Sequence, residues 1–147
     1  TGMVAGLATI TPASGFVGPL GAFIIGIVAG IGCFYATQLM KKRYLIDDSL
    51  DVFPVHGVGG MMGLLLTAVF SSEQFGGLGL DEGVGILDQL GVQLQGTIAI
   101  ILWTLIVSYV LLRLIDKFIP VRVSEQDEVV GLDIAMHDEK GYNLDNL

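Results

Sequence analysis

One histidine stands inside an apolar stretch of the chain. His56 lies four residues into the run Val52–Phe70, which carries no other ionisable side chain. A neutral imidazole has one donor and one acceptor nitrogen, so it can pass on a proton without keeping a charge. Because ionisable groups at membrane depth are costly, they mark a functional site by default. We therefore take His56 as the first candidate functional residue. The alternative is a structural histidine bonded to a neighbouring helix.

Three aspartates, Asp47, Asp48 and Asp51, come just before this run. A carboxylate at a helix N-terminus accepts backbone N–H bonds and faces the positive end of the helix dipole, so Asp48 or Asp51 can cap a helix. The basic run at 41–43 also allows an ion pair that closes the loop, and the acids together allow a cation-attracting vestibule. Pro54 is tolerated only in a first turn, which places the helix start near Asp51.

The composition excludes several classes of protein. Of 147 residues, 52% are hydrophobic and 21 are glycine, and the mean hydropathy is +0.73, which is too apolar for an ordinary soluble domain. The net charge of −8 leaves no basic patch for nucleic acid. We find no phosphate-binding loop, nucleophile elbow, paired catalytic carboxylates or metal-ligand spacing. We therefore predict a membrane protein in contact with lipid that is not an enzyme and needs no metal or cofactor.

The apolar residues divide into several segments. Residues 1–40 carry no charge, and as one helix they would reach about 60 Å, twice the hydrocarbon thickness. The residues at 11–15 are typical of a turn and divide this stretch. We predict an all-α, polytopic membrane helical bundle with a transmembrane region at 1–119 and a tail at 120–147. Its elements are the end of a helix at 1–10 and helices at about 16–40, 52–70 and 90–118.

Charge predicts the orientation of these helices. Basic residues follow the first and third complete spans, whereas the loop at 71–89 has four acids and no base. Because short basic flanks stay cytoplasmic, we expect the C-terminus to be cytoplasmic. Pairs of glycines four residues apart, Gly26 with Gly30 and Gly59 with Gly63, fit close packing of helices. The chain begins inside an apolar run without a methionine, so we expect it to be the back part of a longer protein.

A resemblance covers essentially the whole chain. The segment at 47–60, Asp-Asp-Ser-Leu-Asp-Val-Phe-Pro-Val-His-Gly-Val-Gly-Gly, resembles the signature of the ammonium transporter family (Amt/MEP/Rh) around its second pore histidine. Residues 5–13 are similar to the family's turn before the preceding helix. Gly131-Leu132-Asp133, followed by His137 and Tyr142, resembles its cytoplasmic tail. The resemblance implies the C-terminal part of an eleven-helix ammonium transporter fold.

The resemblance also implies a function. Members of the family deprotonate ammonium near the outer mouth and conduct ammonia through a hydrophobic pore past a pair of histidines. His56 matches the second histidine, and this chain supplies only that one. Val52, one helical turn away, would line the pore. A homotrimer in the plasma or inner membrane, with a role in nitrogen uptake, is implied as well.

In the family the tail takes part in regulation, and a PII signal-transduction protein can plug the cytoplasmic face. Arg122, Gly131, Asp133 and Tyr142 would carry these roles here. The sequence departs from the family at Pro54, where many members have glycine, and at 138–141, before the tyrosine. Two alternatives stay open. One is an ammonium sensor that signals through the tail, and the other is an inactive structural membrane fragment.

Overall fold

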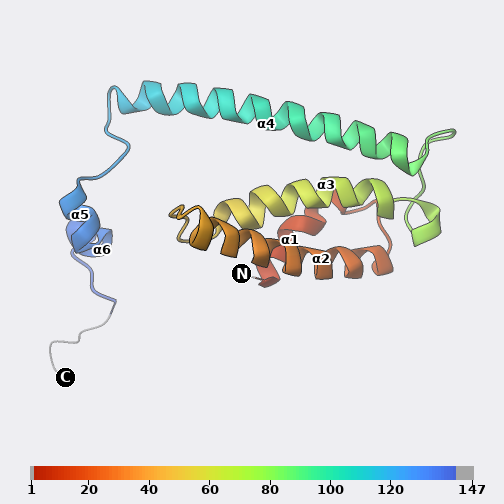
Figure 1. Ribbon diagram of the computed structural model, residues 1–147, viewed down its shortest axis with the longest axis horizontal. Helices are drawn as coiled ribbons and strands as arrows, with labels where there is room; N and C mark the ends of the chain where they lie inside the picture. The colour runs from red at the N-terminus through yellow and green to blue at the C-terminus, as the bar shows by residue number, and fades with distance from the viewer. Residues whose placement is uncertain (1, 142–147) are drawn as a thin grey trace. The chain divides into compact units, whose positions relative to one another are not determined.

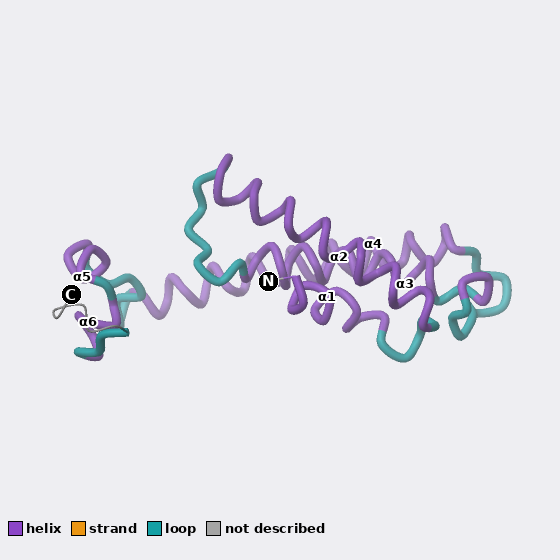
Figure 2. Tube along the Cα trace, turned by 90° about the horizontal axis from the view of Figure 1, so that it is seen from below, coloured by secondary structure: helices purple, strands orange, loops and turns teal. Residues whose placement is uncertain are grey.

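The computed structural model describes residues 2–141, and all regular structure among them is helical. Figure 2 shows these helices and the loops that join them. The predicted all-α fold is confirmed. The elements in chain order are α1 (Gly2–Ile10), the 3₁₀ turn η1 (Thr11–Ala13), α2 (Pro19–Gln38), the π-helical turns η2 (Leu39–Arg43) and η3 (Phe53–Val58), α3 (Gly59–Phe70), the 3₁₀ turn η4 (Glu73–Phe75), α4 (Ile86–Asp116), α5 (Glu125–Val130) and α6 (Leu132–His137).

Among the described residues, three helical stretches are long and apolar enough to cross a membrane. They are Pro19–Arg43, Phe53–Phe70 and Ile86–Asp116, where the sequence predicts helices at about 16–40, 52–70 and 90–118. The first begins later than expected because Pro19, with its fixed φ, occupies the first helical turn after the extended Gly18. The last begins earlier because the Asp88 carboxylate accepts the backbone N–H of Gly85 at 3.0 Å, which stabilises an additional turn.

The chain divides into two compact units, one up to Ile101 and one from Leu102 onward, and α4 runs through the boundary. In the first unit α1, α2 and the continuous stretch η3–α3 lie side by side and contact one another (Figure 1). Every fourth residue of each helix is buried at these contacts. The buried positions with this spacing are Ala5 and Thr9 in α1, Gly21, Ile25, Ala29, Cys33 and Thr37 in α2, and Val55, Gly59, Gly63 and Thr67 in η3–α3.

We call these positions the interface stripes. A spacing of four keeps side chains on one face of a helix. Most of the stripe residues are small, so the helix backbones approach closely. A Cβ atom built on Gly63 would collide with the backbone carbonyl of Thr9, and one on Gly59 would lie 2.8 Å from Thr9 Oγ1. The close packing expected of this glycine pair is therefore present in the structure.

The other predicted glycine pair behaves differently. A Cβ atom on Gly26 or Gly30 would meet no described atom within 4 Å. The stripe of α2 instead passes through Gly21, Ala29 and Cys33, which are buried. A spacing of four therefore identifies a helix face, but the sequence does not say which such face is used.

Larger side chains fill the end of the first unit where α1 ends and α2 begins. Ala13, Ile25 and Phe70 form a buried cluster there, and the rings of Phe70 and Phe75 meet edge to face with centroids 5.3 Å apart. The backbone N–H of Leu78 donates to the carbonyl of Phe16 at 3.0 Å. The loop after α3 is thereby joined to the loop before α2.

The second unit carries two short helices after the end of α4. Ser124 caps α5, since its hydroxyl accepts the backbone N–H of Asp127 at 3.2 Å. Gly131 stands between α5 and α6 with φ of +95°, a conformation that favours glycine. The two helices contact each other across this residue.

The close approach at Gly63 makes a prediction about stability. We expect Gly63→Ala to lower the free energy of unfolding of the detergent-solubilised protein by about 1–3 kcal/mol, because the new methyl group displaces the backbone of α1. Gly60→Ala is the matched control, because a Cβ atom there meets nothing within 4 Å. Thermal unfolding of both variants tests this, and equal stability of the two would contradict it.

Candidate functional site

His56 lies in the π-helical turn η3, which has hydrogen bonds from i to i+5. Such turns are rare and are frequently found at functional sites. Val55 is buried, with 3% of its surface exposed, and packs with Ala5 and Cys33. Val52 and His56 flank it on an adjoining face, and both are exposed on this unit. The turn therefore places Val55 in the interface and directs the His56 face away from it.

Two neighbours of His56 restrict the turn. The ring of Phe53 lies against Gly57 so closely that a Cβ atom on Gly57 would be 2.9 Å from Phe53 Cδ2. Pro54 is completely buried at the start of the turn, where its missing N–H costs little. The packing of the turn therefore accounts for glycine at position 57 and proline at position 54, independently of any role of His56.

Asp48 is bonded to the start of this helix. Its two carboxylate oxygens accept the backbone N–H groups of Val52 at 2.8 Å and Phe53 at 2.9 Å. These are donors that a helix N-terminus leaves without intrahelical partners, and bonds from them to a charged acceptor are strong. Its neighbour Asp47 instead accepts a bond from the Ser49 hydroxyl at 3.3 Å. The geometry of Asp48 is that of a helix cap.

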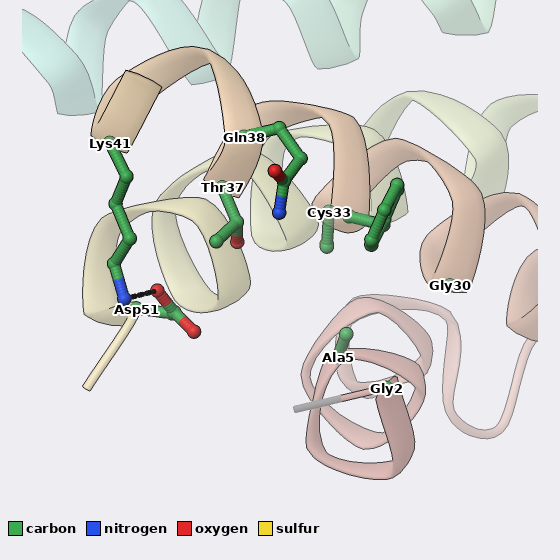
Figure 3. Close-up of a pocket in the computed structure, with 9 residues that line it drawn as sticks. Gly2, Ala5, Gly30, Cys33, Thr37, Gln38, Lys41 and Asp51 are labelled. Atoms are coloured by element: carbon green, nitrogen blue, oxygen red, sulfur yellow. Dashed lines mark ion pairs between the residues drawn. The ribbon is translucent and has the colours of Figure 1, made fainter. Parts of the chain in front are cut away.

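Asp51 joins the two ends of the loop. Its carboxylate lies 2.7 Å from the Nζ atom of Lys41, in the turn η2 that follows α2, and 14% of the Asp51 side chain is exposed (Figure 3). Its backbone carbonyl accepts the N–H of Val55 at 3.0 Å, which begins the helix. Its φ of +56° is in the left-handed region, which non-glycine residues seldom occupy. The structure therefore contains an ion pair between the basic and the acidic cluster, and its members are Lys41 and Asp51.

A cleft of about 420 Å³ adjoins this ion pair. Figure 3 shows Cys33, Thr37, Gln38 and Lys41 along one wall, with α1 opposite. The Thr37 hydroxyl lines the cleft, is largely buried and has no hydrogen-bond partner among the described residues. Among residues 2–141, no group of three or more His, Cys, Asp or Glu side chains is arranged to hold a metal ion.

The predicted tail residues lie in the second unit. Two hydrogen bonds of 2.9 and 3.0 Å join the Arg122 guanidinium to the Glu128 carboxylate. These bonds lower the pKa of Glu128 and raise that of Arg122. Asp133 lies in the first turn of α6, two residues after Gly131. Tyr142 lies outside the described residues.

Sequence reasoning did not predict the π-helical turns or single out Lys41. A signal for Lys41 was present, however. It stands four residues after Thr37 and so continues the stripe of α2, while Asp51 stands four residues before Val55 and continues the stripe of η3–α3. Extending both stripes toward the loop would have selected this pair from the charged residues around it.

Comparison with known proteins identifies the family. The family model described as Ammonium Transporter Family matches residues 1–142. The chain belongs to the Ammonium Transporter Family. It is 42% identical to an ammonium transporter of Aquifex aeolicus over 98% of this chain and 34% of that protein. It is 38% identical to one of Bacillus subtilis over 97% of this chain and 35% of that protein.

A solved structure described as a Sensor Amt Protein is 32% identical, with a TM-score of 0.79 over 92% of this chain and 33% of that one. The chain thus spans about a third of the length of the relatives it matches. Membership of the Ammonium Transporter Family, together with the apolar helices, makes the chain part of a membrane protein. It also confirms the prediction that this is a family of transporters and not of enzymes.

The geometry of Asp48 predicts the effect of removing it. We expect Asp48→Ala to lower the free energy of unfolding by about 0.5–2 kcal/mol, because two backbone N–H groups at the helix start lose their acceptor. Asp47→Ala removes an equal charge next to it and should change stability by less than about 0.5 kcal/mol. Thermal unfolding in detergent measures both. If the two substitutions are equally destabilising, charge and not capping is responsible.

Proposed function

We propose that the complete protein moves ammonium across a membrane, and that His56 lines its pathway. In this proposal ammonium is deprotonated, and ammonia passes through a hydrophobic pore and along a pair of histidines. His56 is one member of the pair, and residues outside this chain supply the other. Val52, one helical turn from His56, forms part of the pore wall.

The observation that carries the proposal is the position of His56. It lies in a stretch long and apolar enough to cross a membrane, in a member of the Ammonium Transporter Family, on a face that this unit leaves exposed. Keeping an ionisable group in such a stretch is costly unless it faces a polar path or a partner. Close packing at Val55 holds the helix while leaving the His56 face available to a pathway.

The chemistry of the site supports passage of the neutral species. An ammonium ion loses strong hydration in an apolar pore, whereas ammonia loses much less. A neutral imidazole offers ammonia one donor and one acceptor nitrogen. Val52 adds an apolar wall on the same face, toward the loop at 44–51.

We further propose that this loop and the tail are cytoplasmic, in the plasma or inner membrane. Lys41, Lys42 and Arg43 lie at the end of one span, and Arg113 and Lys117 at the end of another, as expected of cytoplasmic flanks. A homotrimer is the proposed assembly. In the tail, Arg122, Gly131 and Asp133, with Tyr142, are the proposed regulatory residues, and a PII signal-transduction protein is the proposed partner.

An ammonium sensor is the second candidate function. The observation that favours it is the structural similarity to the Sensor Amt Protein. In a sensor, the same histidine site would bind ammonium and the tail would report its occupancy to a partner. Measuring ammonium flux into liposomes that contain the purified complete protein separates the two, because a sensor needs occupancy but not a high flux.

The proposed role of His56 predicts a specific loss. We expect His56→Ala to reduce ammonium uptake by about tenfold or more, equivalent to about 1.4 kcal/mol or more in the barrier. His137→Ala is the matched control. His137 is the other histidine of this chain and ends the short helix α6, so its substitution should leave uptake unchanged. Uptake into proteoliposomes, normalised to folded protein, measures both. Normal uptake and selectivity in His56→Ala would rule out the proposed role.

A further inference from the structure

When the interface stripes of α2 and η3–α3 are continued toward the loop at the same spacing of four residues, each reaches a charged residue. These two charged residues form an ion pair. The stripe of α2 passes through Cys33 and Thr37 and reaches Lys41, while that of η3–α3 reaches Asp51 beyond Val55. Cys33 and Val55 are packed together, and the Lys41 and Asp51 side chains meet at 2.7 Å. The ion pair is therefore the last contact of the helix interface before the loop.

This pair lies next to the two irregular turns of the first unit. Lys41 belongs to the π-helical turn η2, and Asp51 directly precedes Val52 and the π-helical turn η3. Asp51 also has a left-handed backbone, a conformation that surrounding contacts must maintain. Two contacts do so, since its carboxylate binds Lys41 and its carbonyl accepts the N–H of Val55.

We infer that Lys41 is a positioning residue for His56, acting through its ion pair with Asp51. The inference rests on the proposed pore role of His56. Because His56 directly follows Val55 in the same helical turn, its side chain keeps its direction only while Asp51 and Val55 stay in the interface. Lys41 holds Asp51 there. Its observed ion pair is with Asp51 and not with the imidazole.

The experiment removes the charge and keeps the side-chain stem. We expect Lys41→Met, in the complete protein in proteoliposomes, to lower the maximal rate of ammonium uptake per folded protein about tenfold, because small misplacements of a working group are costly. The half-saturating concentration should change by less than about twofold, since the substitution leaves the entry of ammonium untouched. Lys42→Met is the matched control and should keep the normal rate, as should the conservative variant Lys41→Arg.

A second readout does not depend on transport. We expect the ¹⁵N resonances of the His56 imidazole, recorded by solid-state NMR in lipid, to shift in Lys41→Met and in Asp51→Asn but not in Lys42→Met. The double variant should resemble either single one, because the two residues act as one pair. If wild-type protein carries no ammonium, the proposed function fails while this spectroscopic test still stands.

Three results would overturn the inference. One is a normal uptake rate with unchanged His56 resonances in folded Lys41→Met. Another is an equal loss in Lys42→Met, which would show that general basic charge is responsible. The last is a loss in Lys41→Met that disappears when the rate is normalised to folded protein, which would show that the pair stabilises the fold without positioning His56.

Discussion

Close approach of helix backbones is the constraint on which the first unit depends. Within a bilayer, lipid is as apolar as a leucine side chain, so hydrophobicity does not drive these helices together. They associate through contacts that only small side chains permit, as at Gly63 against the backbone of Thr9 and at Gly59 against Thr9 and Cys33. One methyl group at Gly63 would have to move a helix. Whether this interface tolerates a larger side chain therefore depends on the distance between the helix backbones and not on the buried area.

The same constraint decides where polar groups can be placed. A stripe of small residues leaves no room for a long side chain along its length, but Lys41 and Asp51 occupy its end, where the loop begins and 42% of the Lys41 side chain is exposed. Val52 and His56 directly follow Asp51 and Val55, and both side chains are exposed on this unit. The interface stripe and the candidate site thus lie on two different faces of the stretch η3–α3.

Much of this arrangement could be predicted from the sequence. The rest could not be predicted, for physical reasons. The spans follow from length and hydropathy, and a cap near Asp48 follows from carboxylates ahead of a helix. The sequence did not separate Gly59 and Gly63, which pack, from Gly26 and Gly30, which do not among the described residues, because both pairs have the same spacing. The π-helical turns at 39–43 and 53–58 were missed because a run of helical residues in the sequence fits a π-helical turn as well as an α-helical one.

The exposed face at His56 indicates what this unit contributes to a larger protein. Its own core is closed around Cys33 and Val55 at one end and around Ile25 and Phe70 at the other, so the described helices do not enclose His56. A pathway along His56 needs a second wall, and the chain spans only about a third of the length of its relatives. We therefore interpret the first unit as a rigid support. In the proposed function, it fixes the direction of one imidazole with bonds at Asp48 and Asp51 and with packing at Val55, and residues from elsewhere complete the pore.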